Sequence, residues 1–129
     1  IISQGVNPMI KIMVVEDERN LQLLYQQELS EEGYEIVVVG DGETAAEKAK
    51  TENPDLVVLD IMMPGMDGLE TLGKILSQDN TVPVILNTAY SHYKENFMSW
   101  SADAYVVKSS DLTELKKVIQ RILQERGKI

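Results

Sequence analysis

One apolar run constrains the fold more than any other part of the sequence. Residues Leu56–Leu59 are four consecutive aliphatic side chains, and the run ends abruptly at Asp60. Such a run is typical of a strand that is buried on both faces, as in a parallel sheet covered by helices. Pro64 and Gly65 then predict a turn. Because ligands of open α/β sheets bind beyond the carboxyl ends of the strands, we expect Asp60 to have a functional role rather than only to cap the next helix.

Further apolar runs of strand length alternate along the chain with segments of helical periodicity. Strands are predicted at residues 9–15, 35–39, 82–86 and 104–107. Helices are predicted at 20–32, around 69–76, around 93–100 and at 112–123. A further helix is predicted to begin after Asp41, which would be its N-cap. In these helices apolar residues recur at spacings of three and four. Asp111 and Glu114 have the spacing of a capping box at the start of the last helix.

The alternation of five strands with five helices predicts an α/β sandwich with a parallel sheet. Right-handed crossovers place helices on both faces of such a sheet, which gives three layers. We expect a single domain over residues 9–126, because no repeat, low-complexity tract or linker interrupts this region. Residues 1–8 lack periodicity, so we interpret them as disordered or as a remnant of expression.

Charge and composition exclude several classes of protein. The 129 residues include 21 acidic and 12 basic side chains, and the formal net charge of −9 disfavours direct contact with nucleic acid or an anionic membrane. The chain has no cysteine, which excludes a disulfide framework and a thiolate metal site. No apolar run approaches the roughly 20 residues that a membrane span needs. These features fit a globular protein of the cytoplasm.

Polar and charged side chains stand at the carboxyl ends of four of the predicted strands. They are Glu16, Asp17, Asp60, Thr88 and Lys108. Because these strand ends share one edge of a parallel sheet, we expect the five side chains to form one site. Three adjacent carboxylates repel one another unless a cation lies among them, and a ligand set made only of oxygen favours Mg²⁺ over zinc. A lysine that faces such a cluster is better explained as a partner for an oxyanion than as a solvated strand end.

Three motifs are similar to those of a known family. They are Val-Val-Glu-Asp-Glu at residues 14–18, Leu-Asp-Ile-Met-Met-Pro-Gly-Met-Asp-Gly at 59–68 and Asn-Thr-Ala-Tyr at 87–90. Together they resemble the receiver domains of bacterial two-component response regulators, from about Met9 to Leu123. The resemblance implies a flavodoxin-like fold with strand order 2-1-3-4-5. It also implies that a sensor histidine kinase or a phosphotransfer protein passes a phosphoryl group from a phosphohistidine to an aspartate.

The resemblance implies roles for the acidic residues of the site. Asp60 looks like the phosphoacceptor, and Glu16 and Asp17 look like the acidic pair that holds Mg²⁺. The backbone carbonyl of Met62 would complete the protein's share of the metal ligands. The protein would then be no enzyme in the ordinary sense, but a phosphoacceptor that assists its own phosphorylation and its slow dephosphorylation.

The same resemblance implies a switch. Thr88 and Lys108 look like the residues that bind the phosphoryl oxygens, and Tyr105 looks like the aromatic side chain that moves together with Thr88. An ordinary strand tyrosine is the alternative for Tyr105. The switched surface would consist of the helix around 93–100, the strand at 104–107 and the last helix, and a homodimer would use this surface.

Two further positions are expected to set the lifetime of the phosphorylated state. In this family, side chains two positions after the phosphoacceptor and two after the switch hydroxyl flank the path of the attacking water. Here they are Met62 and Tyr90. Met62 offers no useful hydrogen bond and Tyr90 is bulky, so we predict slow loss of phosphate.

The chain departs from the family pattern at three positions. Glu16 stands where aspartate is commoner, and its extra methylene predicts contact with the metal through water. Ser109 follows Lys108 where many receivers have proline, and a cis bond there would cost about 3 kcal/mol more than before proline, which leaves the backbone of this turn open. Ser101 replaces a common glycine, with no consequence that we can assign.

Other functional classes share parts of this pattern. A flavodoxin needs a phosphate-binding loop of hydroxyl and glycine residues after the first strand, where this chain has three acids. A hydrolase with an aspartyl-phosphate intermediate needs a second acid at the position of Met62. The kinase itself is excluded, because the only histidine, His92, is expected in a surface loop and no nucleotide-binding segment is found. A phosphorylation-independent protein-interaction module with the same fold stays open.

Overall fold

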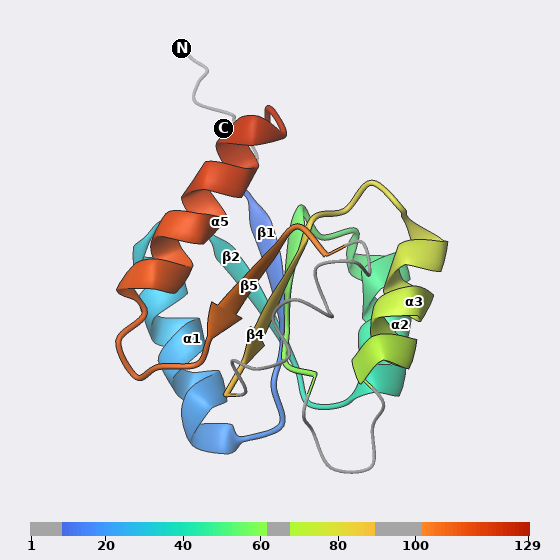
Figure 1. The fold of residues 1–129 in the computed structure, drawn as a ribbon, viewed down its shortest axis with the longest axis horizontal. Coiled ribbons are helices and arrows are strands. Elements are labelled where there is room, and N and C mark those ends of the chain that lie inside the picture. The colour runs from blue at the N-terminus through green and yellow to red at the C-terminus, as the bar shows by residue number, and fades with distance from the viewer. Residues whose placement is uncertain (1–8, 62–67, 90–101) are drawn as a thin grey trace.

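The computed structural model describes residues 9–61, 68–89 and 102–129, which Figure 1 shows in colour. The strands are β1 (Lys11–Val15), β2 (Glu35–Val39), β3 (Leu56–Leu59), β4 (Val84–Thr88) and β5 (Ala104–Val107). The helices are α1 (Arg19–Glu31), α2 (Gly42–Glu52), α3 (Gly68–Gln78) and α5 (Thr113–Glu125). The predicted alternation is therefore confirmed, and the helix predicted around 93–100 lies outside the described residues. Every helix in the described chain falls short of the length and apolar character that a membrane-spanning helix requires.

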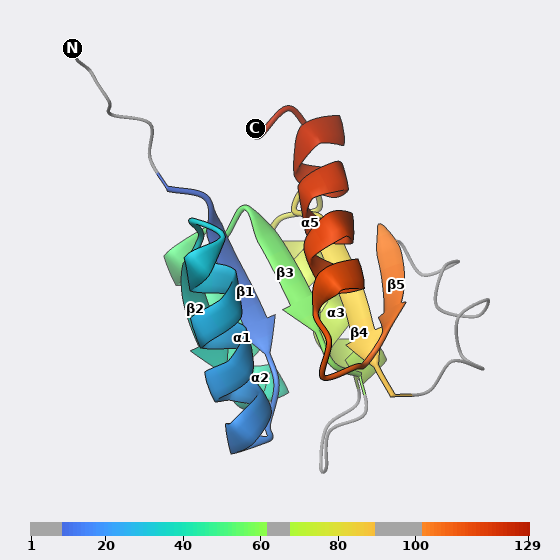
Figure 2. The same ribbon diagram turned by 90° about the vertical axis from the view of Figure 1, so that its left-hand side faces the viewer.

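The five strands form one parallel sheet of order β2-β1-β3-β4-β5. β1 lies between β2 and β3, with Val15 opposite both Val39 and Leu59. β4 lies between β3 and β5, with Leu86 opposite Leu59 on one side and Tyr105 on the other. All strands point the same way, toward the lower edge of the sheet in Figure 2. The flavodoxin-like strand order expected from the resemblance is confirmed.

Helices cover both faces of the sheet and give the expected three-layer sandwich. Figure 2 shows α1 and α5 in front of the sheet and α2 and α3 behind it. Side chains on β3 belong alternately to two core clusters. Val57 and Leu59 pack with residues of α2 and α3, whereas Leu56 and Val58 pack with residues of α1 and α5. This two-sided burial is the reason why β3 is apolar at every position.

The ends of α1 and α2 follow local signals in the sequence. Asp41 caps α2 as predicted, because its Oδ1 accepts the Thr44 N–H at 2.7 Å. The C-cap of α2 is Asn53, whose φ of 53° is in the left-handed region. After α1, Gly33 adopts a φ of 95° and donates its N–H to the Ser30 carbonyl at 3.0 Å.

The capping box predicted for the last helix is wrong. α5 begins at Thr113, with Leu112 as N-cap and without a side-chain capping bond. Asp111 Oδ1 instead accepts the N–H of Thr113 at 2.9 Å and its O–H at 2.6 Å. Because this aspartate bonds only two residues ahead, it forms a turn before the helix and does not cap it.

β4 and β1 differ from their predicted bounds. β4 runs from Val84 to Thr88 rather than over 82–86, and its last two residues pair with Val106 and Val107 of β5. Polar side chains suggested an earlier end, but the backbone makes the ladder bonds, so the strand continues. β1 begins at Lys11 rather than at residue 9.

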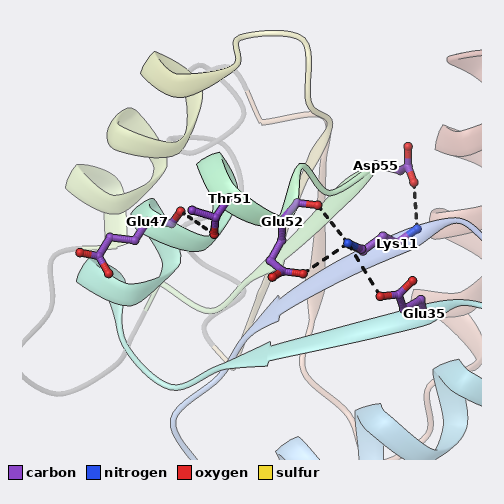
Figure 3. Close-up of polar contacts among 6 residues, drawn as sticks. All are labelled: Lys11, Glu35, Glu47, Thr51, Glu52 and Asp55. Atoms are coloured by element: carbon purple, nitrogen blue, oxygen red, sulfur yellow. Dashed lines mark hydrogen bonds and ion pairs between the residues drawn. The ribbon is translucent and has the colours of Figure 1, made fainter.

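Charged side chains at the amino-terminal edge of the sheet are paired with one another. Figure 3 shows the Lys11 side chain between Glu52 and Glu35, with Nζ 3.3 Å from Glu52 Oε1 and 3.8 Å from Glu35 Oε2. Asp55 Oδ2 accepts the Lys11 backbone N–H at 2.8 Å, and Asp55 Oδ1 lies 3.5 Å from Lys128 Nζ. These contacts fix the start of β1 against residues that follow α2 and α5.

A second aspartate at this edge repeats the arrangement. Asp103 Oδ2 accepts the Val84 N–H at 2.9 Å, and Asp103 Oδ1 pairs with the Arg126 guanidinium. Arg126 also donates to the Thr81 carbonyl at 2.8 Å. Asp55 and Asp103 thus each accept the first N–H of a neighbouring strand, and each pairs with a basic side chain that follows α5. The charges at this edge have a structural role.

Candidate functional site

Backbone hydrogen bonds place the predicted site residues at the opposite, carboxyl-terminal edge. Asp60 directly follows β3 and donates its N–H to the Val15 carbonyl at 3.1 Å. Lys108 directly follows β5 and donates its N–H to the carbonyl of Thr88, the last residue of β4, at 2.7 Å. Glu16 directly follows β1. The parallel ladders therefore bring together residues that are far apart in the sequence.

Three carboxylates meet at this edge. Glu16, Asp17 and Asp60 each offer an oxygen atom, and these oxygens all lie within 4.8 Å of one another. Glu16 and Asp60 are 1% and 4% exposed, whereas Asp17 is exposed to solvent. The cluster thus has a buried floor and one accessible carboxylate. This convergence is what the strand ends predicted.

The Lys108 ammonium lies against two of these carboxylates. Its Nζ is 2.6 Å from Glu16 Oε1 and 2.7 Å from Asp60 Oδ2. Burial acts against the ammonium, but the hydrogen bonds to Asp60 and Glu16 outweigh it and raise the pKa of Lys108. Three carboxylates and one ammonium give this group a formal charge of −2. A divalent cation would balance this charge.

Glu16 is held by its own loop as well as by Lys108. Its Oε2 accepts the Glu18 N–H at 3.0 Å, and its backbone carbonyl accepts a hydrogen bond from Gln22 Nε2 at 2.6 Å. Burial raises the pKa of Glu16, although the hydrogen bond from Lys108 opposes this shift. The fixed side chain keeps an oxygen in the acidic cluster. Contact with a metal through water stays a prediction.

Thr88 and Tyr105 face the same side of the sheet. Leu86 and Tyr105 are register partners and belong to the core cluster on the α2 and α3 side, and Thr88 lies two positions after Leu86. Thr88 is fully buried, and its Oγ1 has no hydrogen-bond partner among the described residues. Tyr105 is 7% exposed. A buried hydroxyl without an acceptor is uncommon and can bind an oxygen that arrives with a ligand.

Several predicted positions receive no structural account. Met62, Tyr90 and Ser101 lie outside the described residues, so their expected roles stay predictions. The turn after β5 is described, and no cis peptide bond occurs in the described chain, so the Lys108–Ser109 peptide is trans. Ser109 Oγ accepts the Asp111 N–H at 3.1 Å.

One polar pair beneath the site was not singled out from the sequence. Asn87 Nδ2 donates a hydrogen bond to the Tyr25 hydroxyl at 2.8 Å, and the two side chains are 3% and 1% exposed. The sequence carried two signals for it: a polar residue inside an otherwise apolar strand, and a tyrosine on the buried side of an amphipathic helix. Neither signal shows that the two residues meet.

The donor set of the site fits a hard divalent cation. The ligand atoms available in the described residues are carboxylate oxygens, and Mg²⁺ is commonly held by one or two carboxylates together with water and phosphate oxygens. The exposed Asp17 leaves one side of the cluster open for such ligands. The residues present are therefore consistent with Mg²⁺.

Comparison with protein families decides the classification. The family model described as "Response regulator receiver domain" matches residues 12–120. The chain belongs to the response regulator receiver family. The resemblance inferred from the three motifs is therefore confirmed over most of the chain.

Curated relatives agree with this assignment. The receiver domain is 35% identical over 116 residues to the alkaline phosphatase synthesis transcriptional regulatory protein PhoP of Bacillus subtilis, which covers 88% of this chain and 48% of that protein. It is 38% identical over 120 residues to the response regulator ArlR of Staphylococcus saprophyticus, which covers 92% of this chain and 54% of that protein. The chain thus spans about half the length of these relatives.

Solved structures show the same fold. The response regulator TrrA of Thermotoga maritima, crystallised in complex with Mg²⁺-BeF, is 49% identical with a TM-score of 0.83, over 89% of this chain and 100% of that one. TrrA in complex with the histidine kinase ThkA matches at 49% identity with a TM-score of 0.81, over 89% of this chain and 99% of that one. The receiver domain therefore shares its architecture with a protein solved in both of these complexes.

Proposed function

We propose that Asp60 accepts a phosphoryl group from the phosphohistidine of a sensor histidine kinase or a phosphotransfer protein, in a reaction that requires Mg²⁺. The observation that carries this proposal is the convergence of Asp60 with Lys108 and two further carboxylates at one edge of the sheet. The complexes of TrrA with Mg²⁺-BeF and with a histidine kinase support the choice of metal and partner.

The transfer forms one bond and breaks another. A carboxylate oxygen of Asp60 attacks the phosphorus atom, and an O–P bond forms while the N–P bond of the phosphohistidine breaks. The electron pair of the N–P bond goes to the imidazole nitrogen of the partner. Such transfers are catalysed mainly by positioning and by neutralising charge on the phosphoryl oxygens.

The residues around Asp60 supply this positioning and neutralisation. Lys108 is within hydrogen-bond distance of Asp60, so it can shift a bond from the carboxylate to a phosphoryl oxygen. The buried Thr88 hydroxyl can donate to a second oxygen. Glu16, Asp17 and Asp60 would hold a Mg²⁺ ion, with the Met62 carbonyl as a further proposed ligand, and the ion would supply positive charge to the reaction.

Phosphorylation is proposed to change the face that contains β5 and α5. Movement of Thr88 toward the phosphoryl group would vacate space on the side of the sheet that Tyr105 shares. After such a rearrangement the phosphorylated and unphosphorylated states would make different contacts, and a switch requires such a difference. A homodimer or another partner that uses this face would respond to the modification.

In this proposal the domain is a phosphoacceptor that assists its own phosphorylation and loses phosphate slowly. The second candidate is a phosphorylation-independent interaction module. The buried Thr88 hydroxyl and the Lys108–Asp60 pair favour the first candidate, because a bare module has no use for a phosphoryl-binding hydroxyl.

The test is intact mass spectrometry after incubation of the protein with acetyl phosphate and Mg²⁺. We expect a gain of one phosphate, which disappears when Asp60→Asn removes the nucleophile or when a chelator removes the metal. Asp55→Asn is the matched control, because Asp55 has the same chemistry at the opposite edge of the sheet. This variant should gain phosphate like the wild type.

Two outcomes would contradict the proposal. A wild-type protein that gains no phosphate from acetyl phosphate or from phosphorylated histidine kinase would favour the interaction module. Equal phosphorylation of Asp60→Asn would show that another residue is the acceptor.

A further inference from the structure

The buried pair Tyr25–Asn87 connects α1 with the end of β4. Asn87 is the fourth residue of β4 and directly precedes Thr88. Because side chains alternate along a strand, Thr88 faces the α2 and α3 side while Asn87 faces the side covered by α1 and α5. Asn87 meets Tyr25 there, at a separation of 62 positions in the sequence. The position of the Thr88 backbone is therefore tied to α1 through its neighbour.

The pair lies at an apolar layer of the core on the side of Tyr25. Tyr25 belongs to the core cluster that contains Ile85, Leu29 and Ile119. An amide placed in such a layer loses stability unless it is hydrogen-bonded, and two aliphatic side chains would fill the space without this cost. What the polar pair adds is direction, because a hydrogen bond fixes a distance and an angle that aliphatic contacts leave free.

α1 also holds the acidic loop of the site. Gln22 lies three residues before Tyr25, on the same face of the helix, and donates to the Glu16 carbonyl at 2.6 Å. One face of α1 thus contacts both the loop that carries the acidic pair and the strand that carries Thr88. Burial raises the pKa of Tyr25, and the hydrogen bond from Asn87 opposes this shift.

We propose that Tyr25 and Asn87 are positioning residues for phosphoryl transfer. Their hydrogen bond holds the backbone at the end of β4 against α1, so that the Thr88 hydroxyl turns toward the phosphoryl group from a backbone position that is fixed relative to the acidic loop. This inference rests on the proposed function and adds two residues to it. Neither residue touches the phosphoryl group, and both act through Thr88.

A positioning role predicts that loss of the pair changes the affinity for one ligand and not for another. In the proposed function Mg²⁺ alone would contact the carboxylates and not Thr88, so loss of the pair should leave Mg²⁺ affinity unchanged. Beryllium fluoride with Mg²⁺ mimics the phosphoryl group and would use the Thr88 hydroxyl. In Tyr25→Phe we expect the affinity for beryllium fluoride to fall about tenfold, the size of effect typical of one hydrogen bond to a charged group.

The experiment is calorimetric titration of the protein first with Mg²⁺ and then with beryllium fluoride, together with urea unfolding. The variants are Tyr25→Phe, Asn87→Leu and the double variant. Each single variant leaves one buried polar group without a partner and should be less stable, whereas the double variant replaces both and should recover stability. Tyr34→Phe is the control, because Tyr34 is a half-buried tyrosine outside the carboxyl-terminal edge, and it should change neither affinity.

The double variant distinguishes a positioning role of the pair from a purely structural one. If the pair positions Thr88, the double variant regains its free energy of unfolding but keeps the weakened beryllium fluoride affinity. If the pair is only structural, affinity recovers together with stability, and the proposal is wrong. The double variant decides the question even where Tyr25→Phe fails to fold. Failure of the proposed function is seen separately, because the wild type itself would then bind no beryllium fluoride and gain no phosphate, and both proposals would fall.

Discussion

Lys108 is the residue on which the charge balance of the site depends. Its pKa is raised above the ordinary value of 10.5, since its hydrogen bonds to Asp60 and Glu16 outweigh its burial. A group with a raised basic pKa contributes its full stabilisation below the unfolded-state pKa and loses it only as the pH rises through the folded-state pKa. The ammonium therefore remains charged at and well above neutral pH. The charge that Lys108 would offer to a phosphoryl oxygen in the proposed reaction should therefore not vary with pH in the physiological range.

Replacement of Gly68 should disturb the site even though Gly68 is not one of the charged residues of the site. A Cβ added to it would lie 2.4 Å from the Ile61 Cα and 2.6 Å from the Ile61 carbonyl oxygen, and Ile61 adjoins Asp60. Although alanine favours a helix by about 1 kcal/mol over glycine, relief of this overlap should cost roughly 1–3 kcal/mol. We therefore expect Gly68→Ala to lower the free energy of unfolding in urea and to weaken Mg²⁺ binding.

Gly73 in the same helix provides the control for this prediction. No atom lies within 4 Å of a Cβ added to Gly73, and the residue is exposed. Gly73→Ala should raise the free energy of unfolding by up to about 1 kcal/mol through helix propensity alone. Equal stabilisation by both substitutions would contradict the close approach between Gly68 and Ile61.

At the scale of single elements, the N-terminus of α2 depends on one carboxylate. The pKa of Asp41 is lowered below its ordinary value of 3.8, first by the Thr44 N–H and then by the Thr44 hydroxyl. Loss of such a cap costs about 1 kcal/mol, so Asp41→Ala should be less stable by this amount at pH 7. A lowered acidic pKa contributes stability above the unfolded-state value and loses it as the pH falls through the folded-state value. Urea unfolding should therefore show the difference shrinking below pH 4.

The matched control is Asp41→Ser, which keeps a capping oxygen but has no carboxyl group to titrate. Its free energy of unfolding should be close to that of the wild type at pH 7. The contribution of the cap to that free energy should not fall in acid as it does in the wild type. A constant difference between wild type and Asp41→Ala from pH 7 to pH 2.5 would show that the negative charge of Asp41 adds nothing to the cap.

Strong periodic patterns predicted the elements well, and the hydrogen bonds made at the ends of β4 and α5 explain the errors. The uninterrupted apolar run of β3 and the spacing of the apolar residues in α1 reflect burial on a sheet, which the sequence records directly. The bounds of β4 and α5 depended on whether Asn87, Thr88 and Asp111 end an element. Each of these residues has a choice of hydrogen-bond partners, and sequence spacing does not determine which partner is used.

The residues that form the site could be predicted from the sequence, but the hydrogen bond between Tyr25 and Asn87 beneath it could not. Parallel strands bring their ends to one edge whatever their side chains are, so Glu16, Asp60 and Lys108 could be placed together from topology. The bond between Tyr25 and Asn87 depends on the rotation of α1 over the sheet. Packing of the whole layer sets that rotation, and it cannot be calculated from the spacing of residues in the sequence.

For the molecule as a whole, we expect the folded state to be linked to metal. A ligand that binds only the folded chain stabilises it by RT ln(1 + [L]/Kd), which is about 1.4 kcal/mol at ten times Kd. We expect a Kd of about 1 mM or tighter, because the metal relieves repulsion among Glu16, Asp17 and Asp60. Thermal unfolding in 10 mM MgCl₂ should therefore occur at a higher temperature than in EDTA.

Asp17→Asn should abolish most of this gain without loss of stability in EDTA, because it removes one of the repelling charges. Glu47→Gln is the control, since it removes one exposed charge from α2 and should leave the response to Mg²⁺ intact. A wild-type unfolding temperature that is independent of Mg²⁺ at every concentration would refute the metal site.

The aspartate pairs at the amino-terminal edge join segments that a ribosome makes at different times. Asp55 and Asp103 precede β3 and β5, whereas their cations, Lys128 and Arg126, follow α5. α5 also completes the apolar layer that it shares with α1. At roughly 5–20 residues per second, translation releases all five strands before it releases the segment that covers this layer and locks this edge. The part of this apolar layer that α5 covers therefore stays exposed in the nascent domain until α5 emerges, and the native state of the domain forms only after that point.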